Sequence, residues 1–342
     1  KRLYRLYFKS RDLLWNLSGK TRDQSIRGGN QMIKNVASAP LPAVENYIVK
    51  KQRLEPENLT GNEKRISVVT GIHGDELEGQ YVCYEIQRRI KEHPEYLTGI
   101  VDIYPALNPL GIDAIIRGIP HFDLDMNRIF PGNSEGSMAE YIASKIIDDV
   151  KESDLCFDIH ASNIFLREIP QVRINELCED TLLPYAKRLN IDYVWVHGAA
   201  TVLEATFAHS LNMIGTPVLV VEMGVGMRVT KEYCKHLVDG IFVEMKDLGM
   251  WQGEVITPKD PLISTDGEVH YLNAGYAGIF LPTVEHWTNV KKGDKIGEIL
   301  DPLEGVVKEE LYSECDGILF TLREYPVVSE GSLIGRILER QA

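Results

Sequence analysis

The segment 66–76 constrains the fold most strongly, because a strand-like run passes there through a glycine turn into a helical pattern. It reads Ile-Ser-Val-Val-Thr-Gly-Ile-His-Gly-Asp-Glu. The turn carries His73, Glu76 follows three residues later, and apolar residues then recur at helical spacing. His73 is therefore expected on the strand-to-helix turn and Glu76 in the first helical turn, where residues three apart share a face, so both side chains reach one point. An imidazole and a carboxylate at one point are two of the three protein ligands that a catalytic zinc site needs.

Strand and helix patterns alternate along the chain as far as residue 248. Further strands are expected at 45–54, 100–105, 155–159, 193–196 and 218–221, and helices at 77–91, 138–150, 175–189, 202–213 and 230–248. This alternation predicts an α/β fold with a mostly parallel, mixed sheet and helices on both faces. Ligands of such sheets bind beyond the carboxyl ends of the strands. Because His73, His160 and Glu222 each follow a strand, we expect them to meet at one edge.

The last part of the chain is rich in glycine and in short strand patterns. The segments 290–299 and 328–337 both have the form V-x-x-G-x-x-I-G-x-I and begin 38 residues apart. Two similar β units predict a small all-β domain with internal two-fold symmetry. We therefore expect a basic N-terminal extension at 1–34, an α/β domain at 35–255 and a β domain at 256–342.

Charge and cysteine content exclude several classes of protein. The net charge of −13 argues against nucleic-acid binding. Residues 1–34 carry nine Lys and Arg against two Asp. They either touch a membrane surface or pack as a helical extension on this chain or a second subunit. We favour packing as a helical extension.

No apolar run approaches the ~20 residues of a membrane span, and no signal peptide is visible. Five scattered cysteines without a C-x-x-C pattern indicate reduced thiols and a cytoplasmic protein.

Four motifs, taken together and in this order, identify a family. They are Gly71-x-His73-Gly74-Asp75-Glu76, Asp125-Met126-Asn127-Arg128-Ile129-Phe130-Pro131-Gly132, Asp158-Ile159-His160 and Val221-Glu222-Met223-Gly224. The second motif lies in a long irregular stretch, 112–136, and loops of this length often have a functional role. With these motifs the chain resembles the succinylglutamate desuccinylase/aspartoacylase family of the zinc carboxypeptidase-like superfamily.

The resemblance implies a metal site and a reaction. Carried over residue by residue, the ligands of one zinc ion per chain are His73, Glu76 and His160, and the general base is Glu222. Zinc would lower the pKa of a water molecule toward ~7 and polarise the scissile carbonyl, while Glu222 carries a proton to the leaving amine. The implied activity is that of a deacylase, which hydrolyses the non-peptide amide bond of a small N-acyl amino acid or related N-acyl amine.

The resemblance also implies substrate-binding residues. Asn127 and Arg128 match a pair that holds the substrate carboxylate, and Arg117 matches an arginine that would bind substrate and stabilise the oxyanion. There are two departures: Ala161 stands where aspartoacylases have Asn, and Asn212 stands where a substrate-binding arginine is expected. The C-terminal part resembles a biotinyl/lipoyl-type β domain that lacks a lysine at its hairpin tip, 301–305, and it would cap the site.

Two other functions stay open at this stage. A zinc carboxypeptidase that cuts peptides would use the same zinc ligands, whereas a capped site would admit only small substrates. A catalytically silent binding or scaffold protein on the same fold is the second alternative, and the complete set of ligands and base argues against it. The sequence leaves open the acyl group, the amine and the oligomeric state, for which a homo-oligomer is one possibility.

Overall fold

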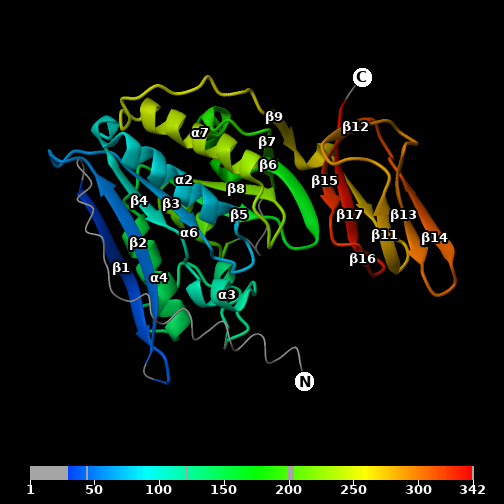
Figure 1. Ribbon diagram of the computed structural model, residues 1–342, viewed down its shortest axis with the longest axis horizontal. Coiled ribbons are helices and arrows are strands. Elements are labelled where there is room, and N and C mark those ends of the chain that lie inside the picture. The colour runs from blue at the N-terminus through cyan, green and yellow to red at the C-terminus, as the bar shows by residue number, and fades with distance from the viewer. Residues whose placement is uncertain (1–29, 44, 121, 199–203, 341–342) are drawn as a thin grey trace, which may run out of the picture.

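The protein is built around a large twisted sheet that carries helices on both faces and continues into a second, smaller sheet (Figure 1). The computed structural model describes residues 30–340, apart from 44, 121 and 199–203. Most of the expected N-terminal extension, residues 1–29, lies outside the described residues. Within the described ranges, no helix combines the length and the apolar character needed to cross a bilayer.

The elements are named as in Figure 1. Ten strands of the large sheet follow the spatial order β1 (Asn30–Pro40), β2 (Asn46–Glu55), β4 (Ile100–Tyr104), β3 (Arg65–Thr70), β5 (Leu155–Ala161), β8 (Val218–Gly224), β6 (Leu166–Asn175), β15 (Gly317–Arg323), β17 (Leu333–Glu339) and β10 (Val269–Asn273). β12 (Thr288–Val290) pairs with β15, while β7 (Tyr193–His197) joins β6 to β9 (Leu262–Thr265). The second sheet has the order β14 (Val306–Tyr312), β13 (Lys295–Asp301), β11 (Gly278–Pro282) and β16 (Val327–Val328). The helices are α2 (Glu78–Glu92), α3 (Pro109–Ala114), α4 (Met138–Val150), α5 (Glu179–Arg188), α6 (Phe207–Met213) and α7 (Lys231–Asp247).

The expected α/β class is confirmed, and parallel pairing occurs in a central block and again between β6, β7 and β9. β4, β3, β5 and β8 form a parallel block, as crossover helices between strands require. β1, β2, β6 and the C-terminal strands add antiparallel pairs around it. The sheet is therefore mixed, and the carboxyl ends of its central strands meet at one edge.

Two apolar layers cover the two faces of the sheet. On one face, α2, α5 and α7 pack buried residues such as Ile86, Leu182 and Phe242 against the strands. On the other face, α4 and α6 contribute Ile142 and Phe207. Burial on both faces explains why nearly every residue of the central strands β3 and β5 is buried, instead of every second one.

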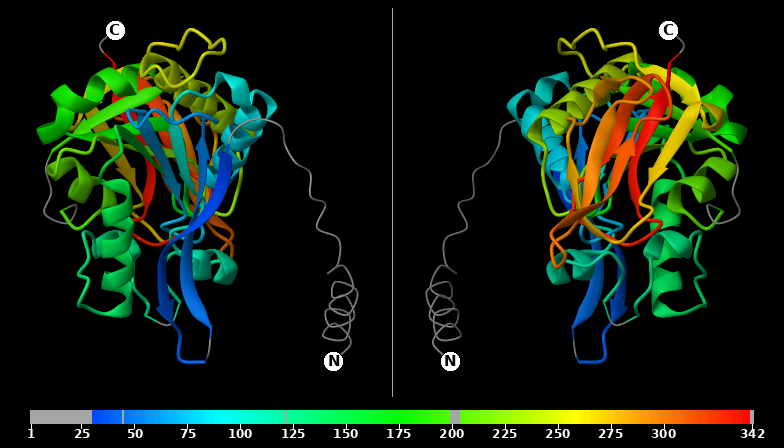
Figure 2. Two further views of the ribbon diagram at one scale, coloured as in Figure 1. Left: turned by 90° about the vertical axis from the view of Figure 1, so that its left-hand side faces the viewer. Right: turned by 90° about the vertical axis from the view of Figure 1, so that its right-hand side faces the viewer.

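The C-terminal strands continue the large sheet instead of forming a separate body. β15 pairs with β6, and β9 pairs with β7, so these strands cover edges that would otherwise be left unpaired. Seen from that end of the molecule, the orange-to-red strands face the viewer (Figure 2, right). The expected domain limits, between residues 34 and 35 and between 255 and 256, and the lipoyl-type fold stay predictions. β1 begins at Asn30, before the first limit. The large sheet contains strands from both sides of the second limit.

The sequence repeat corresponds to two equivalent strand–turn–strand units. In the first unit β12 lies in the large sheet and β13 in the small one, whereas in the second β16 lies in the small sheet and β17 in the large one. Both turns contain a glycine in the left-handed region, Gly293 at φ 91° and Gly331 at φ 80°. The first unit thus runs from the large sheet to the small one and the second unit runs in the reverse order, as internal two-fold symmetry predicts.

The contact between α7 and the end of α5 gives a stability prediction. A Cβ atom added at Gly240 would lie 1.8 Å from the carbonyl oxygen of Leu189, so backbone has to move. We expect Gly240→Ala to lower the free energy of unfolding by about 1–3 kcal/mol, the usual range for an overpacked core. The control is Gly267→Ala, since a Cβ there would have no neighbour within 4 Å. Equal thermal unfolding midpoints for the two variants would contradict this packing.

Candidate active site

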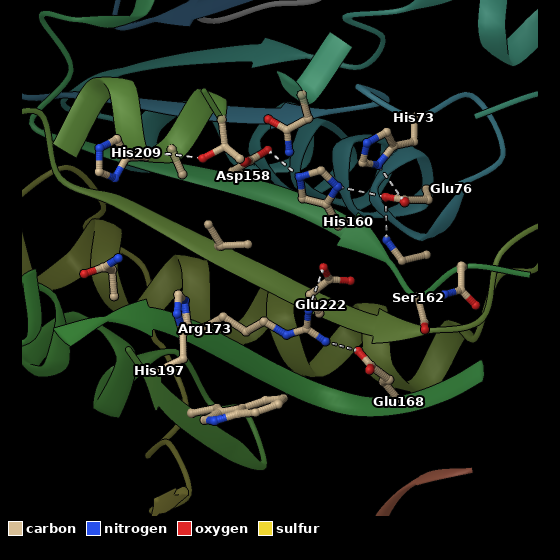
Figure 3. Close-up of a pocket in the computed structure, with 18 of the residues that line it drawn as sticks. His73, Glu76, Asp158, His160, Ser162, Glu168, Arg173, His197, His209 and Glu222 are labelled. Atoms are coloured by element: carbon tan, nitrogen blue, oxygen red, sulfur yellow. Dashed lines mark hydrogen bonds and ion pairs between the residues drawn. The ribbon is translucent and has the colours of Figure 1, made fainter. Parts of the chain in front are cut away.

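The carboxyl edge of the central strands brings the expected catalytic residues together, as Figure 3 shows. His73 lies in the turn after β3, as expected. His160 and Glu222 lie within β5 and β8 and are direct partners in the parallel ladder. The expectation that they follow their strands is wrong by two or three residues, because this pairing lengthens both strands. The expectation that Glu76 lies in the first helical turn is also wrong, since α2 begins at Glu78.

The Glu76 carboxylate lies between the two imidazoles. Its Oε1 is 2.7 Å from His73 Nδ1, and its Oε2 is 2.8 Å from His160 Nδ1. The side chains of all three residues are at most 5% exposed. One ligand atom from each lies within 4.8 Å of the other two. The structure therefore places two imidazoles and one carboxylate at one buried point, which is the donor set of a catalytic zinc site with a position left for water.

Each imidazole has a second carboxylate behind it. His73 Nε2 is 3.0 Å from Asp125 Oδ1, and His160 Nε2 is 3.2 Å from Asp158 Oδ1. Carboxylates in this position fix the ring orientation of histidines that ligate a metal. Neither aspartate was predicted to have a role, although Asp158 stands two residues before His160 on the same strand face. This pair behind the ligands is the observation that fits zinc best.

The buried charges shift one another's protonation equilibria. Burial alone would lower the pKa of His160, but Asp158 and Glu76 outweigh it and raise this pKa. Burial would raise the pKa of Glu76, but His160 and His73 hold it below its usual range. The pKa of Glu222 rises to about 7 because burial outweighs the opposing Arg173 and His160. A carboxylate whose pKa is raised takes up a proton more readily, which suits a general base.

A close backbone approach places Arg117 at the cluster. Gly74 N–H donates to the Arg117 carbonyl at 3.2 Å, and a Cβ at Gly74 would lie 2.0 Å from the backbone of Gly111. The glycine thus lets α3 and the segment after it pass close to the turn that carries His73. Arg117 Nη1 then donates to Glu76 Oε1 at 3.0 Å, so the arginine lies beside the cluster.

The turn η3 (Met126–Arg128) supplies the expected substrate-binding pair. Asn127 is buried, and its Oδ1 accepts a hydrogen bond from Phe207 N–H at the start of α6. This leaves the amide NH₂ of Asn127 as a donor. Arg128 is exposed to the cavity, with one guanidinium nitrogen donating to the Asn127 carbonyl at 2.7 Å. Both residues line the same cavity as the cluster.

The cavity has a volume of about 740 Å³ and extends from the cluster across β8, β6 and β7. Its far wall includes Arg173 and Trp195, and the C-terminal strands contribute Tyr271 and Arg336. The sequence analysis missed these residues. Only Arg173 had a local signal, because residues 171–175 of β6 alternate between polar and apolar side chains.

The two departures from the family pattern have local structural explanations. Ala161 uses its backbone N–H to donate to Glu76 Oε2 at 3.2 Å, a contact that does not require a particular side chain. The Asn212 side chain donates to the Val218 carbonyl and accepts from the Val218 N–H. Asn212 thus ties α6 to the start of β8 while it lines the cavity.

A family model of the succinylglutamate desuccinylase/aspartoacylase catalytic domain matches residues 62–246. The chain belongs to this family, and the predicted resemblance is confirmed.

Three relatives illustrate the similarity. An N-alpha-acetyl-L-2,4-diaminobutyric acid deacetylase of Halomonas elongata is 28% identical over 279 residues, which are 79% of this chain and 80% of that protein. A succinylglutamate desuccinylase/aspartoacylase from Rhodobacter sphaeroides superposes with a TM-score of 0.76 and 22% identity, covering 94% of this chain and 99% of that one. The product-bound ectoine utilization protein EutE (DoeB) from Ruegeria pomeroyi gives a TM-score of 0.77 and 19% identity, covering 92% and 95%. These two structures support the fold.

Proposed function

We propose that this protein is a zinc-dependent deacylase that hydrolyses the amide bond of small N-acyl amino acids or related N-acyl amines. The observation that carries the proposal is the buried His73–Glu76–His160 cluster with carboxylates behind both imidazoles. The relative from Halomonas elongata is named as a deacetylase of an acetylated amino acid, which supports this substrate class. The particular acyl group and amine are left to experiment.

The proposed roles divide between the metal ligands and the other residues of the cavity. His73, Glu76 and His160 would hold one zinc ion, which when bound lowers the pKa of water and polarises a carbonyl. Glu222 takes a proton from the attacking water and returns it to the amine nitrogen as the C–N bond breaks. Arg117, beside Glu76, offers its guanidinium to the developing oxyanion.

The size of the cavity favours small substrates over peptides. At about 740 Å³ it falls within the ~300–1,000 Å³ that is typical of small-molecule sites. Tyr271 and Arg336 of the C-terminal strands line it, which supports a capping role for this part. A carboxypeptidase would need room for the chain on the acyl side of the scissile bond.

We also propose a cytoplasmic location, because all five cysteines are unpaired.

Arg128 gives a prediction about the substrate carboxylate. We expect Arg128→Lys to lower kcat/KM about 10- to 150-fold, since a point charge cannot replace the planar guanidinium and a charge-assisted contact contributes ~1.5–3 kcal/mol. Methyl-esterifying the substrate carboxylate should cost the wild type a similar factor and the variant much less. Arg228→Lys is the control, because Arg228 also donates to the preceding carbonyl but lies outside the cavity. Equal losses on esterification in both proteins would show that Arg128 does not bind a carboxylate.

A further inference from the structure

A row of alternating charges connects the C-terminal strands with Glu222. Arg336, on β17, donates through Nη1 to Glu168 Oε1. Glu168 Oε2 accepts from Arg173 Nη2 at 2.7 Å, and Arg173 Nη1 lies 3.4 Å from Glu222 Oε1. Figure 3 shows the inner end of this row, with Arg173 between Glu168 and Glu222. Within the described part of the chain, Arg173 is the one hydrogen-bond partner of the Glu222 carboxylate.

The middle of the row is rigidly held. Glu168 is 2% exposed and accepts a further hydrogen bond from Gln171 Nε2 at 3.0 Å. The guanidinium groups of Arg173 and Arg336 both lie 5.6 Å from the ring centre of Trp195, a distance at which cations and aromatic rings attract. The Glu168 carboxylate has a defined position, because its two oxygens each accept a hydrogen bond from a different arginine. Arg173 therefore presents Nη1 to Glu222 in a fixed direction.

We propose that Arg173 is a positioning residue for Glu222, and that Arg336 holds Arg173 in place through Glu168. The proposal rests on the deacylase function and on Glu222 as its base. A general base works only when its oxygen is within hydrogen-bond reach of the proton it takes. The contact of 3.4 Å to Oε1 orients the carboxylate, and Oε2, for which the described residues provide no hydrogen-bond donor, can accept the proton. The C-terminal strands would thereby contribute to catalysis as well as covering the cavity.

A neighbouring ion pair provides the matched control. Arg167, also on β6, forms two hydrogen bonds of 3.0 Å with Glu324, which directly follows β15. This pair joins the same two parts of the protein as the Arg336–Glu168 pair does. It is solvent-exposed, however, and does not line the cavity. A purely structural role of Arg336 would change stability and leave the turnover of the folded protein at that of the Arg167 variant, whereas a positioning role would change turnover.

The test compares Arg336→Gln, Arg336→Lys and Arg167→Gln in the full-length, zinc-loaded protein. We expect Arg336→Gln to lower kcat about 3- to 10-fold with KM changed less than about 2-fold, and Arg336→Lys to recover part of the loss. Arg167→Gln should keep wild-type kcat. Zinc content, measured on the same samples, should be alike in Arg336→Gln and Arg167→Gln. The thermal midpoint of the zinc-free protein should fall more in Arg336→Gln, because its ion pair is buried and that of Arg167 is exposed.

A double mutant separates the row from independent effects. Arg173→Gln should lower kcat by about 10- to 100-fold, within the cost of misplacing a catalytic group by ~1 Å. Adding Arg336→Gln should then cost little more, because both residues act through the same contact. Two results would overturn the positioning role and leave the proposed function standing. One is a fall in kcat of the double mutant that equals the product of the two single falls, and the other is the same kcat for Arg336→Gln and Arg167→Gln. Absence of hydrolysis by the wild type would instead overturn the proposed function and this inference with it.

Discussion

Replacing His73 with alanine is expected to remove zinc from the protein. The wild type should bind about one zinc per chain through one carboxylate and two imidazoles. Loss of a ligand should weaken binding by more than the roughly 10- to 100-fold that follows removal of a residue behind a ligand. Elemental analysis after dialysis against a weak chelator measures the effect, and hydrolysis should disappear with the metal.

His209→Ala is the control for this experiment. His209 lines the same cavity but stands outside the three-residue cluster. The control variant should retain about one zinc per chain, because its histidine is not one of the three ligands. Full metal occupancy in His73→Ala would show that zinc, if present, is held elsewhere.

Replacing Glu222 with glutamine should abolish most of the turnover and leave the metal in place. Glutamine keeps the size and shape of the side chain but cannot accept the proton of the attacking water. We expect kcat to fall at least ~10²-fold, within the range for general acid–base catalysis. Zinc content and thermal stability should stay close to those of the wild type. A variant with near wild-type kcat would assign the base to another residue.

Much of the site was predictable because its chemistry lies close to strong local signals. Gly71 and Gly74 mark the turn after β3 in the sequence, and His160 and Glu222 stand at the ends of apolar runs. A parallel sheet then brings these ends together without further information. Asp158 was also within reach of this argument, since residues two apart on a strand share a face.

The parts that the sequence analysis missed depend on tertiary pairing. β1 is an edge strand with a bulge between Asn35 and Ala37, so its alternation is irregular and the basic residues before it dominate. Pro170 and a register shift between Glu168 and Gln171 interrupt β6, which hides an alternating pattern. Arg336 approaches Glu168 only because β17 and β15 extend the sheet beyond β6. No local sequence pattern predicts such a contact between residues far apart in the chain.

The most direct test of the account is a hydrolysis screen with the zinc-loaded, full-length protein. The substrates are N-acetyl, N-succinyl and N-formyl amino acids, together with blocked peptides that end in the same amino acids. We predict release of a free amine from at least one N-acyl amino acid, loss of this activity on chelation, its return with zinc, and no cleavage of the peptides. Efficient cleavage of the peptides, or no release of amine from any N-acyl amino acid, would contradict the central claim.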